Sequence, residues 1–250
     1  MRAIIIGAGR GSRLMPTTEN APKCFAEIQG KRILDWTIEA LRGGGCSEIC
    51  FVGGYRMEAV QRDYPEFVFR TNRDWPDNNI LVSLMCAEDL MDRPFITAYS
   101  DILFTAQLVA GLVQAKDEIA LGVDTDWREH YKPRTRHPPH DAEKVITRDG
   151  RVERVHRGIP YEAATGEFIG VAKFGSEGAR CLRAFYHQRK AEFWGRPYRE
   201  APLFQKAYLI HLFQDMIEHG IAFGHADTPG KYREIDTQED MDLAQTLWQP

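Results

Sequence analysis

Residues 2–23 read RAIIIGAGRGSRLMPTTENAPK, and the beginning of this stretch decides the fold. The apolar run Ala3–Ile6 predicts a buried strand, and three of the next five residues are glycine. Glycines allow positive φ and let main-chain N–H groups approach a ligand, and such groups bind phosphate oxygens. A glycine-rich turn without a ligand is the alternative. The stretch is neither a Walker A loop, because Ser12-Arg13 stands where Gly-Lys is required, nor a dinucleotide fingerprint, because the third glycine is missing.

Two basic residues, Arg13 and Lys23, follow the glycines. Pro22 disfavours helix for the residue before it and presents Lys23 from a rigid backbone. A glycine cradle with an arginine and a fixed lysine suits a triphosphate. An exposed lysine on a turn is the alternative interpretation.

Short apolar runs and helical patterns alternate along the first half of the chain. Strands are expected at 3–6, 48–52, 67–69, 95–99 and 119–123, and helices at 33–41, 57–62, 80–91 and 106–115. Strands separated by helices of this length form right-handed βαβ units. The sequence therefore predicts an α/β fold in which a parallel sheet carries helices on both faces.

The pattern changes near residue 125. Residues 125–141 are polar, rich in proline and histidine and without an apolar period, which predicts an exposed loop or lid. Asp149-Gly150 between the alternating runs 143–147 and 151–156 predicts a hairpin. A strand at 168–174, helices at 177–191 and 203–219, and a last helix capped by Thr237 with Asp240 complete the expectation. We expect a single domain, residues 1–250, with a small β-rich insertion.

The composition is that of a globular protein, since 43% of the 250 residues are hydrophobic and 27% are charged. A net charge of −4 argues against general nucleic-acid binding, which needs a basic surface. There is no run of about 20 apolar residues and no signal-peptide pattern, so no membrane insertion is expected. The five scattered cysteines indicate reduced thiols and a cytoplasmic protein. The oligomeric state is open, and a homodimer is one option.

Two aspartates are candidate ligands for a divalent metal ion. Asp101 follows the strand at 95–99, at the carboxyl edge of the sheet where open α/β folds bind ligands. Asp236 ends a short extended run, and Thr237 is the better helix cap beside it, which leaves the Asp236 carboxylate free. Mg²⁺ prefers oxygen ligands and usually takes one or two protein carboxylates. A helix-capping role is the alternative for each aspartate.

Residues 7–41, GAGRGSRLMPTTENAPKCFAEIQGKRILDWTIEAL, resemble the N-terminal signature of the sugar-nucleotide-type nucleotidyltransferases, G-x-G-[ST]-R-[LM]-x-P-x-T-x-x-x-P-K. The resemblance implies a Rossmann-like, mostly parallel sheet. It assigns the phosphates to Arg13 and Lys23, and Mg²⁺ to Asp101 after the central strand and Asp236 near the C-terminus. It also implies that the nucleotide lies on Gly7, Ala8, Gly9, Arg10 and Gly11.

Within this family the chain is more similar to the phosphocholine and phosphonate cytidylyltransferases than to the sugar-1-phosphate enzymes. Asn72, Asn78 and Asn79 match a stretch that lies beside the nucleotide in those enzymes, where Asn amides can read a base edge. One of Asn78 and Asn79 is also expected to cap the helix that begins at Ile80. The preference for CTP over UTP or dTTP rests on this resemblance.

Two positions of this chain differ from the pattern of the sugar-1-phosphate enzymes. They carry a glycine before the metal aspartate and a later Glu-Lys-Pro segment, whereas this chain has Ser100 and Arg157 in the corresponding places. Arg157 can replace the lysine as a contact to the acceptor phosphate, because its planar fork binds phosphate at two points.

Four further residues are candidates for the acceptor site. Trp127 lies among acidic residues, and an aromatic ring flanked by acids can hold a cationic head group. An ordinary solvated loop is the equal alternative. Glu167 and Gly170 match a family stretch that lines the acceptor pocket, and Glu234 precedes Asp236. His130, His137 and His140 lack partners at metal-site spacing and are interpreted as surface histidines.

The predicted function is Mg²⁺-dependent transfer of CMP from CTP to a small phosphate or phosphonate acceptor: phosphocholine, an aminoalkylphosphonate or an amino-acid-derived phosphate. Pyrophosphate is released. Residues 1–124 are expected to bind the nucleotide and residues 125–250 the acceptor. The alternatives are a sugar-1-phosphate nucleotidyltransferase using dTTP, UTP or GTP, and a nucleotide-binding regulatory protein without turnover.

Overall fold

Nine strands form the central sheet of the protein, and the computed structural model describes residues 1–250. Four strands are parallel neighbours in the order β5 (Val68–Thr71), β4 (Glu48–Gly53), β1 (Arg2–Gly7) and β6 (Phe95–Tyr99). The interior of β1 is apolar because both of its faces are covered. The chain runs from β1 to β4 and β5 and then returns to β6 on the other side of β1. The strand order therefore reverses between β1 and β6, which is where open α/β sheets bind ligands.

β11 (Gly166–Phe174) connects the parallel strands to the rest of the sheet. Along one edge it pairs antiparallel with β6 and with β9 (Lys144–Arg148), and along the other edge with β8 (Ile119–Asp124). Its register shifts at a bulge that contains Gly170, whose φ is 79°. β10 (Arg151–Val155) pairs with β9, and β12 (Gly224–Asp227) runs parallel to β8.

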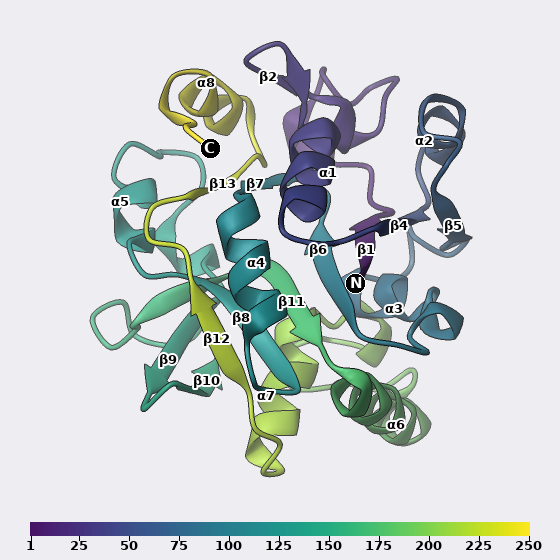
Figure 1. Cartoon of the computed structure of the whole chain (residues 1–250), viewed down its shortest axis with the longest axis vertical. Coiled ribbons are helices and arrows are strands. Elements are labelled where there is room, and N and C mark those ends of the chain that lie inside the picture. The colour runs from purple at the N-terminus through teal and green to yellow at the C-terminus, as the bar shows by residue number, and fades with distance from the viewer.

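Helices cover both faces of this sheet. One core cluster, of 23 buried residues, includes residues of α1 (Ile33–Gly43), α2 (Met57–Asp63) and α4 (Ala106–Gln114). The other, of 34 buried residues, includes residues of α3 (Ile80–Met85), α6 (Ser176–Phe193) and α7 (Leu209–Glu218). Figure 1 shows α1 and α4 across the near face of the sheet. The period-2 alternation of β1 divides its side chains between the two clusters.

Two short antiparallel pairs lie outside the main sheet. β7 (Ile102–Phe104) pairs with β13 (Tyr232–Glu234), and β2 (Glu27–Ile28) pairs with β3 (Lys31–Arg32). The last helix, α8 (Gln238–Leu247), follows β13, and Figure 1 shows it at the edge of the molecule near β2. Its N-cap is Thr237, whose hydroxyl oxygen accepts from the Asp240 N–H, so the predicted cap is confirmed.

The predicted strands of the first half, its helices other than the one at 80–91, and the hairpin around Asp149-Gly150 are confirmed. Three expectations need correction. The helix at 80–91 ends at Met85 and continues only as a short turn at Glu88–Leu90, and the helix at 203–219 begins at Leu209. The segment 125–141 is not an exposed loop: it contains α5 (Trp127–Tyr131), and its large apolar side chains are buried.

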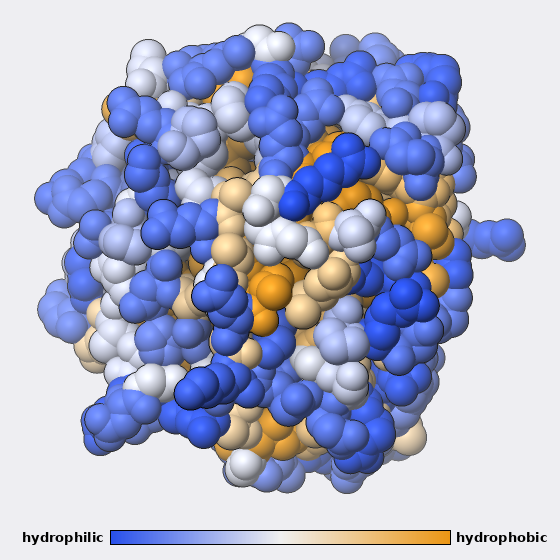
Figure 2. Space-filling model, in the orientation of Figure 1, coloured by the Kyte–Doolittle hydropathy of each residue, from blue (hydrophilic) through white to orange (hydrophobic).

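The surface offers no wide apolar area on the face drawn in Figure 2. Apolar side chains there form separate groups among hydrophilic ones. None of the helices combines the length and the apolar character needed to cross a lipid bilayer.

Candidate active site

A cleft of about 680 Å³ opens where β1 and β6 end. Residues of the glycine loop after β1 form one part of its wall, and Ser100 and Asp101 after β6 form another. The two halves of the chain both contribute, because Glu167 on β11 and Glu234 on β13 also line it. The cleft therefore lies at the reversal of strand order and is bounded by segments far apart in the sequence.

The loop after β1 is shaped by close contacts that only glycine allows. A Cβ on Gly7 would lie 2.5 Å from the Phe51 ring and 2.8 Å from the Ser100 hydroxyl. Gly11 has a φ of 67°, and a Cβ there would lie 2.8 Å from Cδ of Lys23. The Thr18 hydroxyl donates to the Gly11 carbonyl at 2.9 Å and holds this turn.

The loop thus presents Gly7, Ala8, Gly9 and Gly11 to the cleft. A Cβ on Gly9 would meet nothing within 4 Å, which leaves open space beside its backbone. Arg10 is exposed and does not line the cleft; its guanidinium carbon lies 5.5 Å from the centre of the Tyr55 ring. The structure thus separates Arg10 from the other predicted nucleotide contacts of this loop.

Lys23 lies at the centre of the site and contacts both predicted metal ligands. Its Nζ donates to Asp101 Oδ2 at 2.7 Å and to Asp236 Oδ1, while the guanidinium of Arg13 donates to Asp236 Oδ2. Burial by itself would lower the pKa of Lys23, but the charges of Asp101 and Asp236 outweigh it and raise the pKa. Burial opposes ionisation of Asp236 as well, yet Lys23 and Arg13 hold its pKa below the usual value.

The pairing of β7 with β13 brings the two aspartates together. The N–H of Ile235 donates to the Asp101 carbonyl at 3.0 Å, so the two chain segments are joined beside both carboxylates. The Asp240 carboxylate accepts from the N–H groups of Asp236 and Thr237 at 3.1 and 2.8 Å. The backbone at Asp236 is therefore fixed on both sides, and its carboxylate is free to face Lys23.

The residues at this position fit a hard divalent cation. Asp101 and Asp236 supply carboxylate oxygens, and both already face the positive charge of Lys23. A second group of possible ligand atoms, from His137, Glu234 and Asp236, lies within 4.8 Å of one another. Nδ1 of His137 accepts from Arg134 at 2.7 Å, however, so the oxygen pair of Asp101 and Asp236 suits Mg²⁺ better.

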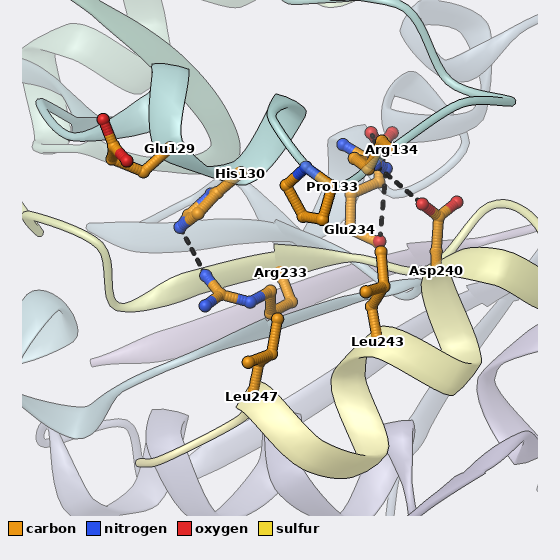
Figure 3. A pocket seen from close by; sticks show the side chains of 9 residues that line it. All are labelled: Glu129, His130, Pro133, Arg134, Arg233, Glu234, Asp240, Leu243 and Leu247. Carbon is orange, nitrogen blue, oxygen red and sulfur yellow. Dashed lines mark hydrogen bonds and ion pairs between the residues drawn. The ribbon is translucent and has the colours of Figure 1, made fainter.

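Arg134 ties the polar segment to the metal side of the cleft. It donates to Asp240 Oδ1 and to His137 Nδ1, both at 2.7 Å, and lies 3.7 Å from the Glu234 carboxylate. Figure 3 shows its guanidinium between Glu234 and Asp240. Burial opposes the charge of Arg134, but the bond to Asp240 outweighs it and raises the pKa. Arg134 and Asp240 therefore hold the turn that carries Asp236.

The interpretation of His130 and His137 as surface histidines is wrong. Both are buried, at 9% and 3% exposure, whereas His140 is exposed as expected. His130 accepts from Arg233 through Nε2 (Figure 3), and burial lowers its pKa to about 3. The sequence around the two histidines is polar and without an apolar period, so it gave no signal for their burial. The rings pack against Tyr232 and Tyr131 and contact charged side chains that meet them only in the fold.

Of the three asparagines predicted to contact the nucleotide, two line the cleft and one supports a neighbour from behind. Asn78 and Asn79 line the cleft, and the Asn79 side chain also accepts from the Ile80 N–H as the cap of α3. Asn72 lies behind them: its Nδ2 donates to Asn78 Oδ1 at 2.7 Å and to the Ser83 hydroxyl at 2.9 Å. Asn72 is buried and does not line the cleft, so it orients Asn78 rather than facing a ligand.

Arg157 lines the cleft together with residues that the sequence alone did not reveal. Its guanidinium lies 4.1 Å from the centre of the Tyr208 ring and 3.3 Å from Glu143 Oε1. Glu143 also accepts from the Tyr99 hydroxyl, and its burial raises its pKa. Glu143, Tyr99 and Tyr208 lie at strand or helix ends with no motif, so only the folded arrangement reveals them.

Glu167, Gly170 and Glu234, the other residues predicted for the acceptor, differ in their relation to the cleft. Glu167 and Glu234 line it, and burial raises the pKa of both carboxyls. Gly170 does not line it: a Cβ there would lie 2.3 Å from the Tyr99 ring, so this glycine makes room for Tyr99.

The expectation for Trp127 is wrong. Its side chain is fully buried and packs edge-on against Tyr131 and Tyr161, in a small cluster away from the cleft. The neighbouring Asp124 is also buried and accepts from the N–H groups of Asp126 and Gly230. The aromatic ring among acids is therefore part of a packed α5 and is not available to an acceptor.

Comparisons with known proteins identify relatives of this chain. A family model described as the MobA-like NTP transferase domain matches residues 3–190. The chain is 30% identical to the CTP:phosphoglutamine cytidylyltransferase of Campylobacter jejuni subsp. jejuni, over 97% of this chain and 98% of that protein. It is 32% identical to the choline-phosphate cytidylyltransferase of Streptococcus pneumoniae over 42% of this chain and 46% of that protein.

Two solved structures share the fold. The inositol-1-phosphate CTP transferase from T. maritima has a TM-score of 0.74 at 20% identity and covers 100% of this chain and 98% of its own. The CTP:phosphocholine cytidylyltransferase from Streptococcus pneumoniae has a TM-score of 0.70 at 18% identity and covers 98% of this chain and 97% of its own. Since the matching family model spans most of the chain, this protein belongs to the MobA-like NTP transferases and is a nucleotidyltransferase.

Proposed function

We propose that this protein transfers CMP from CTP to a small phosphate or phosphonate acceptor and releases pyrophosphate, with Mg²⁺ as the metal. One observation carries the proposal: Lys23, Asp101, Asp236 and Arg13 meet directly beside the glycine loop. The choice of CTP is supported by the full-length relative, named a CTP:phosphoglutamine cytidylyltransferase. The same relative favours an amino-acid-derived phosphate as the acceptor.

The chemistry is an in-line displacement at the α-phosphorus of CTP. An oxygen of the acceptor phosphate forms the new P–O bond, the bond to the bridging α–β oxygen breaks, and pyrophosphate leaves with its electron pair. No side-chain nucleophile is needed because the acceptor is already an anion. Positioning and charge neutralisation therefore carry the rate acceleration.

Each charged residue has a place in this scheme. Arg13 and Lys23 neutralise the departing pyrophosphate, and the backbone N–H groups between Gly7 and Gly11 bind the nucleotide. Asp101 and Asp236 would hold a divalent cation, which would supply further charge neutralisation at the transferred cytidylyl group. Arg157, which also lines the cleft, contacts the acceptor phosphate.

Pyrophosphate release tests the proposal. The purified protein with Mg²⁺ is assayed with CTP, UTP, dTTP and GTP against phosphoglutamine, phosphocholine, 2-aminoethylphosphonate and glucose-1-phosphate. Release with CTP and a non-sugar acceptor is expected, and chelation of Mg²⁺ should abolish it. Release only with glucose-1-phosphate would replace the proposal by a sugar nucleotidyltransferase, and nucleotide binding without release would favour a regulatory protein.

A pair of lysine variants distinguishes the site from general charge effects. Lys23→Ala should lower turnover by at least about 100-fold, the range found when one stabilising group is removed from a transition state. Lys31→Ala is the matched control, because Lys31 lies outside the cleft and pairs with the exposed Glu39. Near-normal turnover of Lys23→Ala would remove Lys23 from the mechanism.

A further inference from the structure

The charges that line the cleft are unexpected for a site that receives two anions. Six acidic and three basic side chains line it. Asp101 and Asp236 face Lys23 and Arg13, and Glu143 lies 3.3 Å from Arg157. Of the three remaining acids, Glu234 lies 3.7 Å from Arg134 and Asp141 lies 3.9 Å from His137. Glu167 is therefore the lining acid without a basic partner, which points to a cationic group on one ligand.

Glu167 is the acid whose bonding leaves a specific vacancy for a donor. Its side chain is only 3% exposed, and Oε1 accepts from the Tyr131 hydroxyl at 2.8 Å. Oε2 is buried without any hydrogen-bond partner, although the residue lines the cleft. A buried carboxylate oxygen without a donor is unfavourable, so a ligand that donates to Oε2 gains a strong bond.

The backbone of Glu167 cannot move away from the cleft. Residue 167 pairs with Asp124 of β8 on one side and with Lys144 of β9 on the other, inside the main sheet. Burial raises the pKa of Glu167 to about 8, since few charges compensate it. A protonated amine is the group that both donates hydrogen bonds and stabilises the ionised carboxylate.

We propose that the acceptor carries a primary ammonium group and that Glu167 binds this group through Oε2. The proposal rests on the proposed function and deepens it. A quaternary ammonium, as in phosphocholine, has no N–H to donate and is held by aromatic faces instead. Aromatic residues, among them Tyr99, Phe168 and Tyr232, do line the cleft, but Glu167 Oε2 needs an N–H donor, which only the primary ammonium supplies.

Calorimetric titration of the wild-type protein with matched probes tests this without any variant. The first set of probes compares phosphoethanolamine, a primary amine, with phosphocholine and ethyl phosphate. The second set compares phosphoglutamine, also a primary amine, with its N-acetyl derivative. Each titration contains Mg²⁺ and α,β-methylene-CTP. The primary amines should bind about 10- to 100-fold more tightly than their partners without an N–H cation, as expected for a hydrogen bond to a charged group. Equal affinity within each set, or no binding of either primary amine, would overturn the proposal.

Glu167→Gln then tests the residue. This variant keeps the shape of the side chain and should reduce the preference for the primary amines to less than about threefold. Glu177→Gln, an exposed acid paired with Arg180 on α6, is the control and should keep the wild-type preference. A preference that survives in Glu167→Gln would exclude Glu167 as the amine-binding group.

The same protein preparations separate this proposal from the proposed function. Amine preference in binding without pyrophosphate release would contradict cytidylyl transfer and leave the amine site standing. Pyrophosphate release at equal rates with amine-bearing and amine-free acceptors would contradict the amine site and leave cytidylyl transfer standing.

Discussion

Replacing Lys23 by methionine should destabilise the protein measured without divalent metal, because two carboxylates lose their shared counter-ion. Removing one partner of a buried ion pair costs about 3–5 kcal/mol. Arg13 remains on Asp236, and the Asp101 side chain is 28% exposed, so we expect the lower end, about 3 kcal/mol. In a chain of this size 1 kcal/mol shifts Tm by about 2–4 °C, which predicts a loss of about 6–12 °C.

Mg²⁺ should restore much of this loss. A divalent cation that binds the folded protein stabilises it by mass action, and the variant leaves both carboxylates without their lysine. Thermal unfolding with and without Mg²⁺ should therefore show a larger rise in Tm for Lys23→Met than for the wild type. Lys31→Met, which removes an exposed ion pair, should change Tm by about 2 °C or less in either condition. An unchanged Tm, or the same response to Mg²⁺ in both proteins, would refute the reasoning.

Three further changes probe the acceptor end and its support. Burial raises the pKa of Glu167 from 4.5 to about 8, so between these pH values the carboxyl ionises in the unfolded chain while it stays protonated in the folded protein, and stability falls as pH rises. The free energy of unfolding of Glu167→Gln should therefore gain at least about 1 kcal/mol relative to wild type between pH 5 and pH 8. Equal differences in urea unfolding at both pH values would contradict this. Gly170→Ala should lower the free energy of unfolding by about 1–3 kcal/mol and raise KM for the acceptor more than for CTP, because the new Cβ displaces Tyr99. An unchanged free energy of unfolding and unchanged KM values would show that the Tyr99 ring can move aside. Arg134→Met should lower the free energy of unfolding, measured in urea, by about 3 kcal/mol, because it leaves the buried Asp240 carboxylate without its cation. It should also weaken the apparent affinity for Mg²⁺. Wild-type values of both quantities would exclude a role of Arg134 in positioning Asp236.

Local patterns in the sequence were sufficient to predict much of the fold. The apolar run of β1 and the alternation with helices indicate a parallel sheet because both faces of such a sheet must be covered. The cap at Thr237 was predictable because its partner Asp240 lies three residues along the chain. The structure also brings Lys23, Asp101 and Asp236 together, as the motif and the strand ends suggested.

The remainder depends on contacts between distant segments. Trp127 stands in a polar stretch, and its burial comes from residues such as Ile159 and Ala164 that meet it only in the fold. Glu143 directly precedes β9 and belongs to no motif, and its place in the cleft follows from the pairing of β9 with β11. The three residues of β7 are too few for a periodic pattern, yet they align the strand that leads to Asp236.

The bond between β7 and β13 also sets an order of events during protein synthesis. The glycine loop, Lys23 and Asp101 leave the ribosome early, whereas Asp236 follows after 134 further residues. Until β13 pairs with β7, the nascent chain has one of the two carboxylates and Lys23 has one of its two partners. The two-carboxylate centre therefore cannot form before β13 has left the ribosome. A nascent chain that ends before Asp236 does not possess it, so under the proposed mechanism such a chain is inactive.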